Sequence, residues 1–99
     1  MVDLNLYLEE GFFKDTVLIF VNGEKVYHKE GLTTHAVIGL ADSMTTNISN
    51  GRVEIEVICK NRNMSKKIAI DLKTAIHLAI SVKDKGIHYR ISKEPFSYM

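Results

Sequence analysis

The feature that most constrains the fold is Asn50-Gly51, which separates two runs of alternating apolar and polar residues. Asn-Gly is the strongest short-range hairpin signal, because both central positions of a type I′ turn need a positive φ. A tight turn here pairs residues 44–48 with 53–57, and a loop at 61–64 then pairs 53–57 with 68–72. Both pairings place the apolar residues on one face, and a slip of one residue would destroy that agreement. The stretch therefore predicts an antiparallel meander of three strands.

The N-terminal part of the chain shows the same patterns. Residues 2–8 alternate leucines with polar residues, as a half-buried strand does. Residues 16–21 are apolar on both faces, which predicts a central strand covered on two sides. Asn22-Gly23 is a second type I′ signature, and it pairs Ile19 with Val26 on a more polar outer strand, 24–28.

A further hairpin is expected near the C-terminus. Residues 75–82 alternate strictly and lead into the four-residue loop 83–86, in which we expect Gly86 to take the left-handed conformation. This hairpin places Val82 opposite Ile87, and the apolar residues that follow fall on the same face.

These elements predict an all-β fold with about eight short strands and no helix. We expect one domain over residues 1–99, built as an antiparallel β-sandwich or a flattened barrel. Its layout is similar to that of immunoglobulin-like and transthyretin-like domains. The similarity concerns layout alone, because the chain has no Trp and no pair of cysteines.

Net charge, apolar segments and cysteine content indicate which partners and which cellular compartment to expect. The net charge of +1 provides no field that would gather phosphates, so we expect no nucleic-acid binding. The N-terminus has no basic segment followed by an apolar core, and no apolar window is long enough to cross a membrane. Cys59 is the single cysteine and ends an apolar row, which favours a buried structural thiol. We expect a cytoplasmic protein without membrane contact.

Residues that could carry chemistry are few. The four histidines show neither H-x-H nor H-x-x-x-H spacing, and no motif for a nucleophile, phosphate loop or dinucleotide is present. We therefore predict no catalytic residue, metal site or cofactor. Residues 30–42 form the least regular segment, and such loops often hold functional sites. His35 in this loop is the candidate for the alternative function, a small hydrolase or metal-dependent enzyme.

Both chain ends carry apolar and aromatic residues, and this observation gives the preferred hypothesis. Pro95 lacks a backbone donor, so residues 94–99 should form an edge segment or a docked tail. Phe96, Tyr98 and Met99 would then dock on their own sandwich or contact a partner. We favour a non-catalytic binding or assembly module that acts through protein–protein contacts, either as a homodimer or with another protein.

Overall fold

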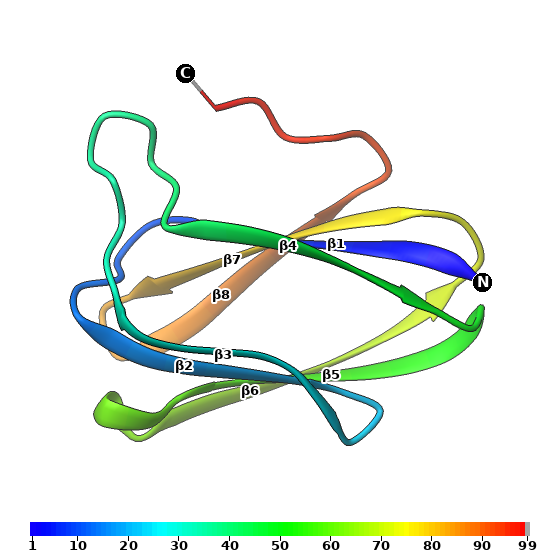
Figure 1. Ribbon diagram of the computed structural model, residues 1–99, viewed down its shortest axis with the longest axis horizontal. Coiled ribbons are helices and arrows are strands. Elements are labelled where there is room, and N and C mark those ends of the chain that lie inside the picture. Colours follow the sequence, from blue (N-terminus) through cyan, green and yellow to red (C-terminus); the bar gives the residue numbers. More distant parts are fainter. Residues whose placement is uncertain (99) are drawn as a thin grey trace.

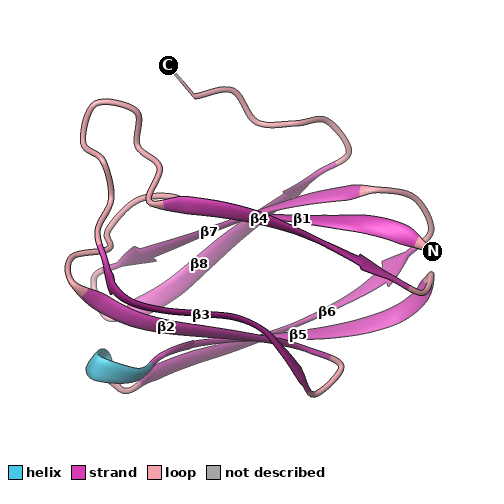
Figure 2. Cartoon of the chain, in the orientation of Figure 1, coloured by secondary structure: helices cyan, strands magenta, loops and turns pink. Residues whose placement is uncertain are grey.

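A computed structural model describes residues 1–98, which fold into two packed β-sheets (Figure 1). Apart from one short 3₁₀ turn, η1 (Lys60–Arg62), the chain consists of strands and their connections (Figure 2). The predicted β-sandwich is therefore confirmed. The strands are β1 (Val2–Leu8), β2 (Asp15–Val21), β3 (Glu24–Leu32), β4 (Asp42–Ile48), β5 (Gly51–Cys59), β6 (Met64–Leu72), β7 (Ile76–Lys83) and β8 (Gly86–Ser92).

The two sheets contain four strands each, in the orders β4-β1-β7-β8 and β3-β2-β5-β6. Neighbouring strands are antiparallel except for β1 and β7, which run parallel. The parallel pair places the N-terminal strand in the interior of its sheet, between two strands that come much later in the chain. As a result β4 and β8 form the edges of one sheet, and β3 and β6 form the edges of the other.

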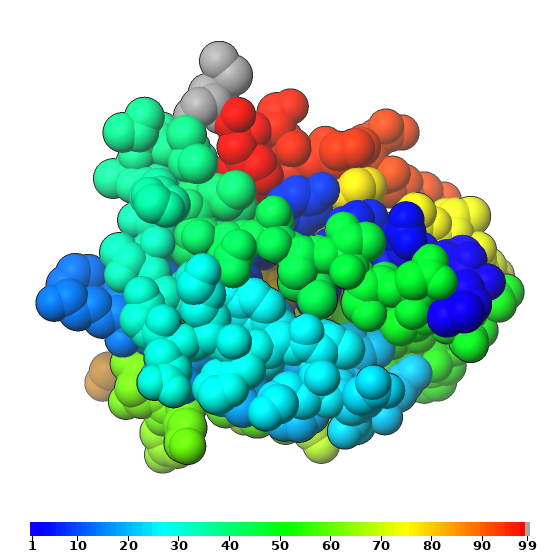
Figure 3. Space-filling model, in the orientation of Figure 1, coloured from blue at the N-terminus to red at the C-terminus, as the bar shows by residue number. Residues whose placement is uncertain are grey.

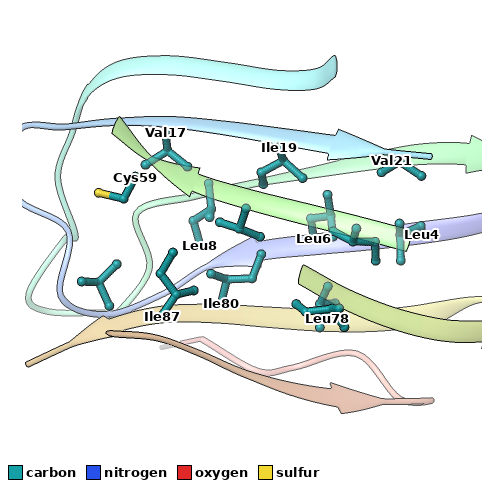
Figure 4. Packing of buried hydrophobic residues seen from close by; sticks show 14 of the residues in the cluster. Leu4, Leu6, Leu8, Val17, Ile19, Val21, Cys59, Leu78, Ile80 and Ile87 are labelled. Carbon is teal, nitrogen blue, oxygen red and sulfur yellow. The ribbon is translucent and has the colours of Figure 1, made fainter. Parts of the chain in front are cut away.

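Alternation along the strands builds one core between the sheets. Leu4, Leu6 and Leu8 of β1 are buried, whereas the residues between them point to the outer face. The same period places Val17 and Ile19 of β2 in the core, opposite β1 and β7 (Figure 4). Leu18 and Phe20 on the other side of β2 are only half-buried, so this strand is central but is not covered on both faces. Cys59 is buried in the same core, as predicted.

Three of the four predicted hairpins are present, those of β2 with β3, β5 with β6, and β7 with β8. Asn22 and Gly23 both have positive φ, 50° and 83°, and they join β2 to β3 as a type I′ turn requires. An irregularity between Ile19 and Phe20 then shifts the register, so that Ile19 faces Tyr27 and not Val26.

In the hairpin of β7 and β8, Val82 faces Ile87, as predicted, and the pairing continues to the end of β8. Its turn is tighter than expected, because Lys83 already pairs with Gly86. The left-handed residue is Asp84, with φ of 57°, and not Gly86.

The predicted meander is wrong at Asn50-Gly51. β4 pairs with β1 in one sheet and β5 pairs with β2 and β6 in the other, so Ser49 and Asn50 cross between the sheets (Figure 1). The apolar alternation of β4 fits β1 as well as it would fit β5: Met44 faces Leu6, and Ile48 faces Val2.

The β5–β6 hairpin exists, but its register differs from the expected one by two residues. Val53 faces Ile70, and Cys59 faces Met64 across the loop that contains η1. A shift of two residues keeps every side chain on its face of the sheet, so the predicted apolar face is correct although the register is not.

Within residues 1–98, no helix is long and apolar enough to cross a membrane.

A buried carboxylate organises one end of the sandwich. Asp15, at the start of β2, has no exposed surface, and its side chain forms a bidentate pair with Arg62 at 2.7 and 2.8 Å. Asn61 Nδ2 and the Phe13 backbone N–H also donate to this carboxylate. Burial alone would raise the pKa of Asp15, but these hydrogen bonds outweigh burial and lower it. Arg62 also donates to the Gly11 carbonyl, so one side chain joins two connections.

We expect Arg62→Ala to reduce the free energy of unfolding by about 3 kcal/mol, because it leaves a buried carboxylate without its cation. The lowered pKa means that the Asp15 contribution is present above about pH 4 and is lost as the pH falls further. In the variant Arg62 no longer lowers the pKa of Asp15, so the loss of stability on acidification should be smaller than in the wild type. Urea unfolding across this pH range measures both effects. Lys60→Ala removes an exposed cation from the same turn and should change neither.

Candidate functional site

The C-terminal segment, residues 93–98, lies across the outer face of the sheet β4-β1-β7-β8 (Figures 1 and 3). Its two aromatic rings pack on Tyr7 of β1. The Phe96 ring meets Tyr7 edge-on at a centroid distance of 5.3 Å, and the Tyr98 ring lies 5.8 Å from it. Both tail rings are half-buried by these contacts. The tail thus lies on its own sandwich, which is one of the two docking places expected for it, whereas Met99 lies outside the described residues.

Two charged side chains, Arg90 and Glu9, also contact the tail. Arg90 of β8 lies over the Phe96 ring at 4.2 Å and forms an ion pair with Glu9 at 2.7 Å. The Tyr98 hydroxyl donates a hydrogen bond to the same Glu9 carboxylate. Glu9 is only 7% exposed, although it follows the end of β1 on the outer face. The tail therefore completes the shell of partners around a nearly buried charge.

The floor of this site is fixed by the strands below it. The Glu9 N–H donates to the Ile80 carbonyl at 2.7 Å, and the Glu9 carbonyl accepts from the Thr34 hydroxyl at 2.6 Å. The Tyr7 hydroxyl and His77 Nδ1 are 2.7 Å apart, which ties β1 to β7. We call the set Tyr7, Glu9, His77 and Arg90 the tail site.

Two groups of the tail and its site have raised pKa values. Burial and the hydrogen bond to Glu9 raise the pKa of Tyr98, so its hydroxyl stays protonated as a donor. The bond to Glu9 raises the pKa of Arg90, which keeps the guanidinium charged. In the structure these groups hold the phenol of Tyr98 and the ring of Phe96.

A second surface lies where the edges β6 and β8 meet. Tyr89 and Ile91 point to the core side of β8, in register with the buried Ile80 and Leu78 of β7. They are nevertheless 43% and 44% exposed, although the Lys66 ammonium of β6 lies 5.9 Å from the Tyr89 ring centroid. We call this pair the β8 strip.

The opposite side of the sandwich is closed by side chains. The Tyr27 hydroxyl of β3 donates to Asp42 of β4 at 2.8 Å, and Lys29 approaches the same carboxylate at 3.5 Å. Burial and the Asp42 carboxylate raise the pKa of Tyr27, so this link persists across the neutral range. Among residues 1–98, the large apolar strand residues classed as exposed, Tyr89 and Ile91, lie on the side of β6 and β8, whereas Val26, Met44 and Ile48 on the side of β3 and β4 are half-buried.

The loop proposed for an enzymatic site is a crossover between the sheets, as expected for that segment. It spans residues 33–41, and the His35 backbone bridges to Leu40 across a tight turn, while its side chain is exposed. A groove of about 340 Å³ beside the loop is lined by Glu10, Gly11, Thr34, Ala36 and Gly39. His35 is not brought together with another titratable side chain in this groove.

The histidines remain apart. His88 faces Ser81 and His77 faces Ser92, as the predicted register requires. In residues 1–98, no three His, Cys, Asp or Glu side chains are placed to hold a metal ion.

Sequence reasoning missed most of the tail site. The alternation of residues 2–8 puts Tyr7 on the polar face and Glu9 just after the strand, and no sequence pattern singled out Arg90. A usable signal was the crowding of Phe96 and Tyr98 beyond Pro95, which predicted docking but not its location.

Comparison of the chain with family models, with curated proteins and with solved structures found no match to any of them.

We expect Tyr27 and Tyr98 to ionise at a higher pH than tyrosines in the unfolded chain, because their pKa values are raised. A raised pKa means that the contribution of Tyr98 to stability is present below about pH 10 and is lost as the pH rises further. An ultraviolet titration of tyrosinate should show late-ionising groups, and Tyr98→Phe should remove one of them. An unchanged number of late groups in that variant would contradict the placement of the tail.

Proposed function

We propose that this protein is a non-catalytic assembly module that pairs with a second copy of itself through β8. The observation that carries the proposal is the β8 strip, in which Tyr89 and Ile91 remain over 40% exposed on the core side of an edge strand. An edge strand presents unpaired backbone groups, and exposed apolar residues beside them favour pairing with another strand.

Two-fold pairing of β8 accounts for the pattern along this strand. With Tyr89 on the symmetry axis, Ile87 of one copy faces Ile91 of the other, and all three lie on the core side. The two sheets would join into one of eight strands, and the apolar row of each copy would continue into the next. A closed symmetric pair covers both edges at once, as is common in homo-oligomers. The tail crosses the outer face of the sheet (Figure 1), and Tyr89 and Ile91 on the core side of β8 remain exposed.

The test is the solution mass of the Ile91→Glu variant. We expect the wild type to dimerise at high micromolar concentration and the variant to raise the dissociation constant about tenfold or more, which corresponds to a loss of about 1.4 kcal/mol. The physical reason is that the substitution replaces an apolar contact by a charge in both copies. Sedimentation velocity over a concentration series measures the effect.

Val37→Glu is the matched control, because Val37 is an exposed aliphatic residue, 92% accessible, in the loop between β3 and β4. It should dimerise like the wild type. A wild-type chain that stays monomeric at high micromolar concentration would overturn the proposal, and so would equal weakening by both substitutions.

A further inference from the structure

We infer that the tail site is a peptide-binding site for an aromatic-x-tyrosine pair, and that the chain's own tail is its exchangeable occupant. This inference goes beyond assembly through β8, since it uses the outer face of the sheet and different residues. It commits to one ligand chemistry: an extended peptide whose first ring packs on Tyr7 and Arg90, and whose phenol donates to Glu9.

The first step is that the tail can dissociate, because side chains and not backbone hydrogen bonds attach it. In the described chain, no hydrogen bond joins the backbone of residues 95–98 to a strand. The attachment consists of the two side chains Phe96 and Tyr98, which are separated by the exposed Ser97. The tail can therefore leave without breaking any strand pairing, and another segment with the same two side chains can replace it.

The second step is that the site exists without the tail. The Glu9–Arg90 ion pair and the Tyr7–His77 contact lie within the sheet and its adjoining turn, and neither involves the tail. The backbone of Glu9 is held on both sides by Ile80 and Thr34. Such a preformed site binds with little ordering cost, because its polar groups already point at the position of the ligand.

The third step is specificity. Glu9 is nearly buried when the tail covers it, so a ligand that places an apolar group there instead removes water from the carboxylate without replacing the lost hydrogen bond. The tyrosine hydroxyl supplies that bond, and Tyr98 occupies the position. Arg90 over the first ring adds a preference for an aromatic side chain. A phenylalanine in the tyrosine position should therefore bind more weakly.

The test uses full-length chains and a labelled, C-terminally amidated peptide of residues 93–98, KEPFSY. The double variant Phe96→Ser/Tyr98→Ser keeps the chain length but releases the tail. In the wild type the tethered tail competes at an effective concentration of about millimolar, so we expect the variant to bind the peptide at least tenfold more tightly. Fluorescence anisotropy measures both affinities, and the peptide KEPFSF should bind the variant several-fold more weakly.

Phe13→Ser is the control, because Phe13 is an aromatic residue, 64% exposed, in the β1–β2 connection, away from the tail contacts. It should exclude the peptide as the wild type does. The inference is overturned if the released variant is folded by circular dichroism but binds no peptide at millimolar concentration. It is overturned equally if that variant does not fold, if the wild type binds as tightly, or if KEPFSF binds as well as KEPFSY. Sedimentation of the same proteins reports separately on pairing through β8.

Discussion

The buried ion pair of Asp15 and Arg62 is the interaction on which this end of the sandwich depends. A carboxylate without solvent contact is costly unless it is paired and hydrogen-bonded, and here Arg62, Asn61 and the Phe13 N–H all contribute. These partners come from the β1–β2 connection and from the η1 turn between β5 and β6. The requirement to satisfy one charge therefore sets how two connections pack, and it fixes the start of β2 in the centre of its sheet. The core strands then align on that anchored strand.

Three surfaces of the molecule differ in the side chains that they present. On the side of β3 and β4, Tyr27 and Asp42 close the sandwich with a hydrogen bond. On the side of β6 and β8, apolar residues stay exposed in an edge strand, and this difference supports assembly through β8. The outer face of the β4-β1-β7-β8 sheet is different again, because Glu9 and Arg90 form a polar site that the tail covers. Both proposals concern binding to another chain, but they rest on different surface chemistry. Pairing through β8 would use exposed apolar side chains, and peptide binding at the tail site would use the nearly buried charge of Glu9.

Local signals predicted the fold well where the turn and the strands that it joins are neighbours in one sheet. The register of β7 and β8 followed from alternation alone, and the Asn22-Gly23 turn behaved as its residues require. The same dipeptide at Asn50-Gly51 misled the prediction, since a turn signal does not say whether the next strand stays in the same sheet. Gly51 does have a positive φ of 125°, but Asn50 does not, and the chain changes sheets there. β4 offers the same apolar face to either partner, so its choice of β1 depends on strands far away in sequence.

The sequence by itself determined the strand content, the core-facing residues and the burial of Cys59, because these follow from a period of two and from turn chemistry. It also predicted that residues 94–99 form an edge segment or a docked tail. Only the tertiary structure decided that β1 lies beside β7, and this parallel pairing of distant strands brings Tyr7 next to His77. The same pairing places Glu9 within reach of Arg90 and of Tyr98, which are more than eighty residues away along the chain. A pattern of near neighbours carries no information about such contacts, because they depend on which strands share a sheet.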